Sequence, residues 1–216
     1  MTQSANPARA LFVATILAGS FLLFLIQPMV ARMALPRLGG APNVWNSAML
    51  VYQALLLGGY AYADWLSRRP FASQVRIHLG LFALAALTLP IALVDLPAPA
   101  PGTEVIWVPA LLALSIGPVF FLVSSQAPLM QRWFSNHPGA GEPWALYAAS
   151  NLGSFAGLIA YPLLAEPLLS LRAQAWGWSA GYLLLLGLIT LAARSRGGLT
   201  GTAASTDAPV EPIAPR

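Results

Sequence analysis

Long apolar runs dominate this chain and leave it too few charged residues to cover a water-facing surface. Of its 216 residues, 57% are hydrophobic and 8% are charged, and the mean hydropathy is +0.68. Soluble domains carry roughly 25% charged residues, so water could not solvate a globule of this composition. The composition therefore excludes a water-soluble protein and predicts an all-α polytopic membrane protein.

Six apolar runs are long enough to cross a bilayer, because a hydrocarbon core of about 30 Å requires about 20 helical residues. The first run outlasts a signal-peptide core and continues through Gln27 and Pro28, which favours a span over a cleavable signal. We therefore predict a short cytoplasmic segment (1–9), a six-helix transmembrane domain (10–194) and a disordered cytoplasmic tail (195–216) that is small, polar and Pro-rich. The predicted spans are 10–32, 44–66, 74–94, 104–134, 143–164 and 173–193.

The arginines orient these spans, since all eleven basic residues are arginine. With the N-terminus inside, the outer loops hold Arg32, Arg37 and Arg172. Seven arginines then lie inside: Arg9, Arg68, Arg69, Arg76, Arg132, Arg194 and Arg196. The positive-inside rule therefore predicts that both termini are cytoplasmic.

Two stretches about one hundred residues apart resemble each other. Residues 27–32 match 126–132 with one insertion, 40–42 match 141–143, and Tyr60 matches Tyr161. Each copy holds three spans, an odd number, so the second copy enters the membrane from the opposite side, as in the 3+3 inverted repeats of transporters. The alternative is that Pro and Gly recur through composition alone.

Residues 59–69 resemble the cytoplasmic motif of the major facilitator superfamily, in which an Asp is followed four and five residues later by basic residues. The match is partial, because Trp65 and Ser67 depart from the motif. An Asp at a helix end beside two arginines can lock one cytoplasmic arrangement and release it in another. We take Asp64, Arg68 and Arg69 as a candidate cytoplasmic gate; the alternative is a positive-inside anchor with an incidental Asp.

A wider resemblance covers residues 11–193 and is carried by 24–32, 35–46, 58–60, 128–134 and 146–154. These stretches resemble the membrane region of the bacterial proteins described as fused major facilitator and spermidine synthase. The resemblance implies half of a major facilitator fold in a bacterial inner membrane. In that family a soluble aminopropyltransferase-like domain follows. The chain has neither a Gly-rich nucleotide loop nor the acidic pairs of such a domain, so we expect no synthase activity and no enzyme.

Neutral polar residues within the spans are the candidate lining of a polar cavity. They accompany Pro28, Pro118 and Pro128, which we expect to break the first and fourth spans. Such groups cannot face lipid without a partner, so we predict that they face a shared interior, either as interhelical contacts or as a solute site. The candidates are Gln27, Gln53, Ser125, Gln126, Asn151 and Ser154.

The sequence thus predicts a half-sized major facilitator-like protein that moves or binds a small, uncharged or weakly charged solute, as a homodimer or with a similar membrane partner. The alternative is a non-transporting scaffold or assembly subunit that pairs with another membrane protein or with a separately encoded spermidine synthase-like domain. We expect no cofactor and no metal, because cysteine is absent and the two histidines, His78 and His137, lack neighbouring ligands. A net charge of +4 from scattered arginines forms no basic patch, so we expect no nucleic-acid partner.

Overall fold

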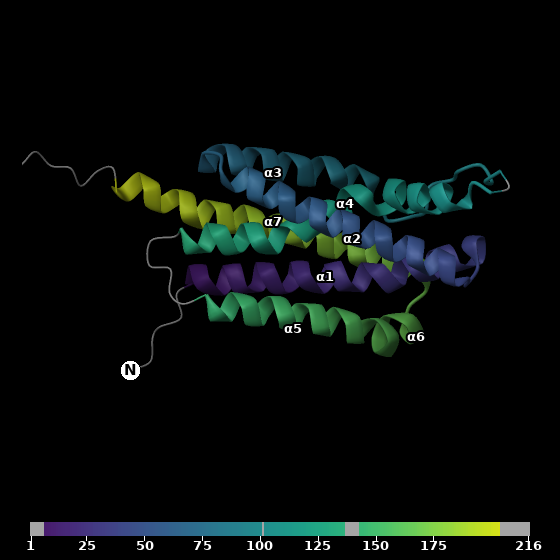
Figure 1. Ribbon diagram of the computed structural model, residues 1–216. Helices are drawn as coiled ribbons and strands as arrows, with labels where there is room; N and C mark the ends of the chain where they lie inside the picture. Colours follow the sequence, from purple (N-terminus) through teal and green to yellow (C-terminus); the bar gives the residue numbers. More distant parts are fainter. Residues whose placement is uncertain (1–6, 101, 137–142, 204–216) are drawn as a thin grey trace, which may run out of the picture.

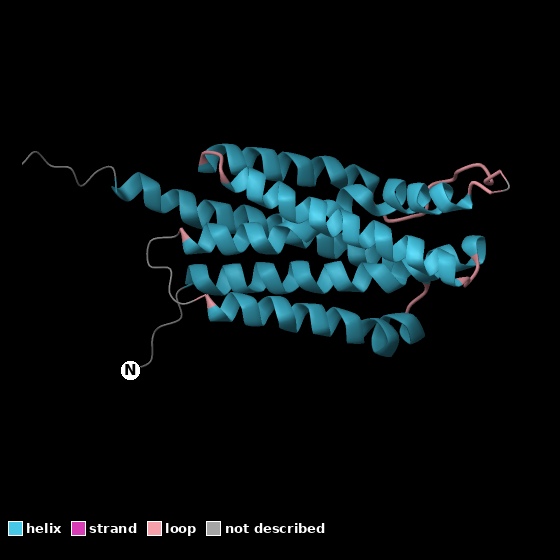
Figure 2. Cartoon of the chain, viewed as in Figure 1, coloured by secondary structure: helices cyan, strands magenta, loops and turns pink. Residues whose placement is uncertain are grey.

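The computed structural model describes residues 7–100, 102–136 and 143–203. Within these ranges the chain forms helices and connecting loops without a strand (Figure 2), so the prediction of an all-α chain is confirmed. The long helices are α1 (Pro7–Leu38), α2 (Pro42–Ser67), α3 (Phe71–Ala85), α4 (Glu104–Ser135), α5 (Trp144–Ala160) and α7 (Leu171–Ala203). A 3-10 turn, η1 (Ala86–Thr88), extends α3, while the π-helical turn η2 (Tyr161–Ala165) and α6 (Glu166–Leu168) extend α5.

Five helical segments are long and apolar enough to cross a membrane, as in an α-helical membrane protein. They are Ala8–Leu38, Phe71–Thr88, Val105–Ser135, Trp144–Leu168 and Leu171–Arg196. The remaining long helix, α2, has 26 residues but is not among the five. Its amide, tyrosine and carboxylate side chains lower its hydropathy, so five of the six predicted spans are helices that are long and apolar enough to cross a membrane.

Three predicted boundaries are wrong. The first helix continues to Leu38 rather than ending at residue 32. The third helical segment ends at Thr88 rather than at residue 94, because Leu89 precedes Pro90 and adopts an extended conformation with ψ of 151°. The last helix continues to Ala203, into the segment that we expected to be tail. Residues 204–216 lie outside the described ranges.

The helices pack in two layers. In the first layer the order is α5–α1–α4–α2, because α1 packs against both α5 and α4, and α4 packs against α2. The second layer consists of α3 and α7, which contact each other and cover α4 and α1 respectively. Consecutive long helices alternate in direction, so the start of α1 and the end of α7 lie at one end of the bundle (Figure 1). We call this the Pro7 end and the opposite one the Leu38 end.

Glycines bring the first-layer helices into backbone contact. A methyl group at Gly157 of α5 would lie 2.5 Å from the carbonyl oxygen of Phe21 in α1. A methyl group at Gly59 of α2 would lie 2.8 Å from the carbonyl oxygen of Phe121 in α4. Only glycine allows approaches this close, as in other tightly packed membrane helices.

The expectation of broken first and fourth helices is wrong. Helix α1 runs continuously through Pro28, and α4 runs through Pro118 and Pro128. Each proline removes one backbone donor, but neighbouring helices support the turns on either side, so the helix continues.

Candidate functional site

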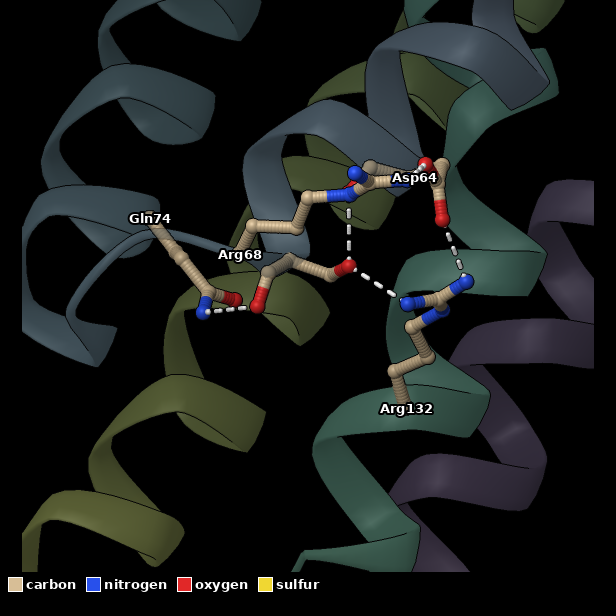
Figure 3. Close-up of polar contacts among 5 residues, drawn as sticks. Asp64, Arg68, Gln74 and Arg132 are labelled. Carbon is tan, nitrogen blue, oxygen red and sulfur yellow. Dashed lines mark hydrogen bonds and ion pairs between the residues drawn. The ribbon is translucent and has the colours of Figure 1, made fainter.

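A charged cluster joins three helices at the Pro7 end (Figure 3). Asp64 lies in the last turn of α2, and its Oδ2 accepts a hydrogen bond of 2.6 Å from Nη2 of Arg68, four residues later. Its Oδ1 accepts a 2.7 Å bond from Nη2 of Arg132, near the end of α4. One carboxylate therefore binds two guanidinium groups, one from Arg68 directly after α2 and one from Arg132 of the neighbouring helix α4.

Two further side chains complete this cluster. Arg132 also donates through Nη1 to Oγ of Ser67 at 2.6 Å. Gln74, in the first turns of α3, donates through Nε2 to the carbonyl oxygens of Ser67 at 3.2 Å and Arg69 at 2.7 Å. These carbonyls have no helical partner because α2 ends here, so the buried amide caps that end. We call Asp64, Ser67, Arg68, Gln74 and Arg132 the Asp64 cluster.

The Asp64 cluster overlaps the predicted gate only in part. Asp64 and Arg68 lie together, as the four-residue spacing predicted. Arg69 does not join them: its guanidinium lies 4.6 Å from the ring centroid of Trp65. Arg132 and Gln74 belong to the cluster but are not among the residues predicted from the sequence. The match of residues 27–32 with 126–132 pairs Arg132 with Arg32 and is the signal that points to Arg132. Whether the cluster gates a path stays a prediction.

The Leu38 end carries a related set of contacts. Nε of Arg32 in α1 lies 3.9 Å from Oε1 of Glu166, and Nη1 of Arg32 donates to the Glu166 carbonyl oxygen at 3.1 Å. Gln174 of α7 donates through Nε2 to the carbonyl oxygens of Ala165 and Leu169, each at 3.0 Å. We call Arg32, Glu166 and Gln174 the Arg32 cluster.

The six candidate cavity residues do not share one interior. Gln126 is fully buried and donates to the carbonyl oxygen of Thr15 at 3.1 Å, which joins α4 to α1. Buried Ser125 bonds within its own helix, as do half-buried Gln27 and Ser154.

The other two candidates, Gln53 and Asn151, lie on the exposed surface of the chain. The prediction of a shared interior is therefore wrong for the single chain. Helices α2 and α5 pack through the faces that carry Gly59 and Gly157. Successive residues of a helix are rotated by about 100°, so Gln53 and Asn151, each six positions before one of these glycines, point away from that face.

The histidines form no ligand set. His78 is fully buried, its Nδ1 lies 3.4 Å from the Tyr62 hydroxyl, and its ring packs edge-on against Phe82. His137 lies outside the described residues. Within the described ranges no three His, Asp or Glu residues gather where they could hold a metal ion.

Comparison of the chain with protein-family models, with curated proteins and with solved structures finds no match. The function is therefore inferred from the geometry of the chain itself.

Proposed function

We propose that the chain is a half-sized major facilitator-like protein, built as a 3+3 inverted repeat, that pairs with a second copy to move or bind a small neutral solute. Both halves carry a similar arginine–carboxylate contact at opposite ends of the bundle, and the two arginines are one hundred residues apart. Arg32 meets Glu166 at the Leu38 end, and Arg132 meets Asp64 at the Pro7 end. This correspondence supports a repeat of structure rather than a recurrence of composition.

The capping amides and the helix pairs support the same repeat. Gln74 and Gln174 are one hundred residues apart, and each caps the helix that precedes it. If the halves are exchanged, the pair α1–α5 becomes α4–α2, and both pairs make extensive contacts. Where α3 meets α7, the rings of Phe82 and Tyr182, again one hundred residues apart, stack at 5.0 Å.

The observation that carries the pairing proposal is a pair of uncovered amides. Gln53 lies six residues before Gly59, and Asn151 lies six residues before Gly157, so each amide has the same position relative to the glycine through which its helix packs. Both are exposed. An amide that faces hydrocarbon without a partner is costly, so a second protein surface is the favourable neighbour.

The side chains around these amides form two matching exposed stripes, spaced alternately by three and four residues along each helix. Such spacing keeps the side chains on one helix face, and a single amide within an apolar stripe favours one register of pairing. The α2 stripe is Leu50, Gln53, Leu57 and Tyr60; the α5 stripe is Ala148, Asn151, Phe155 and Leu158.

Two-fold symmetry determines which stripes meet. Two copies inserted in the same direction are related by an axis parallel to the helices, and this rotation reverses the order of the facing layer. The edge helix α2 of one copy therefore lies opposite α5 of the other. Leu57 lies ten residues before the end of α2, and Phe155 lies eleven residues after the start of α5, so they occupy similar depths.

Disulfide trapping in native membranes tests this pairing, because the chain has no cysteine of its own. The variant Leu57→Cys/Phe155→Cys is expected to form covalent dimers under mild oxidation. The matched control is Leu57→Cys/Leu184→Cys, since Leu184 of α7 is exposed to 62% against 66% for Leu57 but lies in the second layer. Equal trapping in both variants, or none in the first, would contradict the proposed interface.

A further inference from the structure

An open pocket of about 510 Å³ lies at the Leu38 end, between the end of α1, the start of α7 and the residues that follow η1. Arg37 of α1 and Arg172 of α7 line it, and polar as well as apolar atoms face its interior. The larger apolar side chains of its wall are Met33, Ile91, Leu93, Leu171 and Trp176. We call this the Arg172 pocket; it combines two permanently positive residues with an apolar wall.

Both arginines keep donors that are free to bind an anion. Nη1 of Arg37 donates to the carbonyl oxygen of Val94 at 3.1 Å and lies 3.8 Å from Oδ1 of Asp95. The Asp95 side chain is 98% exposed, so water weakens this long ion pair. Arg172 is exposed and makes no hydrogen bond or ion pair with any described residue. Since a guanidinium group has five N–H donors, an anion can bind to both side chains at once.

The first half shows why the second half has a pocket. Trp133 lies one hundred residues after Met33, and Phe71 lies one hundred residues before Leu171. Trp133 is buried, and its ring packs edge-on against Phe71 with 5.2 Å between the centroids. The guanidinium of Arg196 lies 4.1 Å from the centroid of the Phe71 ring. Large side chains therefore fill the equivalent space in the first half, whereas the smaller Met33 and Leu171 leave it open.

The depth of the pocket indicates the kind of anion. Arg37 lies one residue before the end of the first membrane-length segment, and Arg172 lies one residue after the start of the last. Trp176, one turn further along α7, is exposed, and such tryptophans are typical of the membrane–water interface. Phospholipid headgroups lie at the ends of the spans, and arginine binds a phosphate through two parallel N–H···O bonds. The phosphate of a lipid is therefore the nearest anion.

We propose that the Arg172 pocket binds an anionic glycerophospholipid, with the phosphodiester between Arg37 and Arg172 and the start of the acyl chains against Leu171 and Trp176. An anionic headgroup is preferred to a zwitterionic one, because both charged residues of the lining are positive. The site lies within one chain, so it goes beyond the proposed function and depends on neither pairing nor transport.

Native mass spectrometry of the full chain in detergent, titrated with dioleoylphosphatidylglycerol, tests the proposal. The native chain is expected to bind it saturably and more tightly than dioleoylphosphatidylcholine, which has the same chains and a zwitterionic headgroup. Arg172→Gln is expected to weaken this binding at least about fivefold. The matched control is Arg76→Gln, which removes an exposed arginine of α3 and is expected to leave the binding unchanged. Equal losses in the two variants, or no preference for phosphatidylglycerol, would overturn the proposal.

The free headgroup distinguishes a lipid from a soluble phosphate ester. Glycerophosphoglycerol and inorganic phosphate lack acyl chains, so we expect each to bind at least about tenfold more weakly than the lipid. If either binds as tightly as the lipid, the pocket is a site for a soluble phosphate and the lipid assignment is wrong.

A filled pocket tests the location. Met33→Trp places in the second half the ring that Trp133 supplies to the first, and we expect it to weaken phosphatidylglycerol binding at least about tenfold while the unfolding temperature is retained. A folded Met33→Trp chain that binds the lipid as tightly as the native chain would overturn the assigned site.

Discussion

The two ends of the bundle carry corresponding clusters that differ in how firmly they join the helices. At the Pro7 end, Asp64 accepts two hydrogen bonds of 2.6 and 2.7 Å from arginines, and Arg132 also reaches Ser67. At the Leu38 end, the side chains of Arg32 and Glu166 approach only to 3.9 Å. Gln74 uses both ends of its amide, whereas Gln174 uses one. The Pro7 end is therefore more strongly held by side-chain contacts than the Leu38 end.

The largest effect that we expect is a difference in thiol labelling between the two ends of the bundle, because the proposed topology puts them on opposite sides of the membrane. Cysteine at Asn136, at the Pro7 end, is expected to resist an impermeant thiol reagent added outside intact cells, and cysteine at Ala98, in the loop before α4, is expected to react. The arginine distribution is the physical reason. After cells are opened, both positions are expected to react, which controls for access. Labelling of Asn136→Cys from outside would reverse the orientation.

The next effect compares the glycine contacts of the two halves. Gly157→Ala and Gly59→Ala each force a methyl group against a carbonyl oxygen, so each is expected to lower the free energy of unfolding by about 1–3 kcal/mol. Gly187→Ala is the control, because a Cβ there meets nothing within 4 Å. Thermal unfolding in detergent would measure all three. A large loss in only one half would weaken the proposed equivalence of α1–α5 and α4–α2.

A smaller difference in stability against unfolding is expected between the variants of Arg132 and Arg32. Arg132→Gln removes charge-assisted bonds of 2.7 and 2.6 Å to Asp64 and Ser67 and is expected to lower the unfolding temperature. Arg32→Gln loses a 3.9 Å ion pair and one bond to a carbonyl oxygen and is expected to lower that temperature by less, and both effects are small because these side chains are partly exposed. Equal losses, read from the same unfolding curves, would remove the difference between the ends.

If Asp64 also acts as a gate, Asp64→Asn changes activity or assembly while membrane insertion stays normal.

The smallest effect concerns the capping amides. Gln74→Met loses the bond from Trp133 as well as two carbonyl bonds, whereas Gln174→Met loses only two carbonyl bonds. We therefore expect Gln74→Met to lower the free energy of unfolding by about 0.5–1.5 kcal/mol more, the net value of one hydrogen bond. A larger loss from Gln174→Met would contradict the absence of a partner for Oε1 of Gln174 among the described residues.

The helices were predictable because hydropathy over about 20 residues depends on composition more than on contacts. The end of the third helix was harder to predict from hydropathy. Pro90 disfavours a helical conformation at Leu89, so the helix ends there although apolar residues follow. The Asp64–Arg68 contact follows from helical spacing, but the partner Arg132 is 68 residues from Asp64 and is brought there by the packing of α4 on α2.

The wrong prediction for Gln53 and Asn151 has a physical cause. Polar groups avoid lipid, and the prediction therefore placed Gln53 and Asn151 in the interior of the chain. In the structure that interior is defined by the faces that carry Gly59 and Gly157, which leaves both amides outside. If the chain pairs as proposed, the amides still avoid lipid, because they face the second copy.

Native mass spectrometry of the detergent-purified chain is the direct test of whether two copies pair. If the chain pairs, the particle has twice the 22.8 kDa chain mass, and this falls to the monomer mass when Gln53→Leu and Asn151→Leu are combined and the chain still folds. A native chain that is monomeric in every mild detergent and in lipid nanodiscs would contradict the pairing.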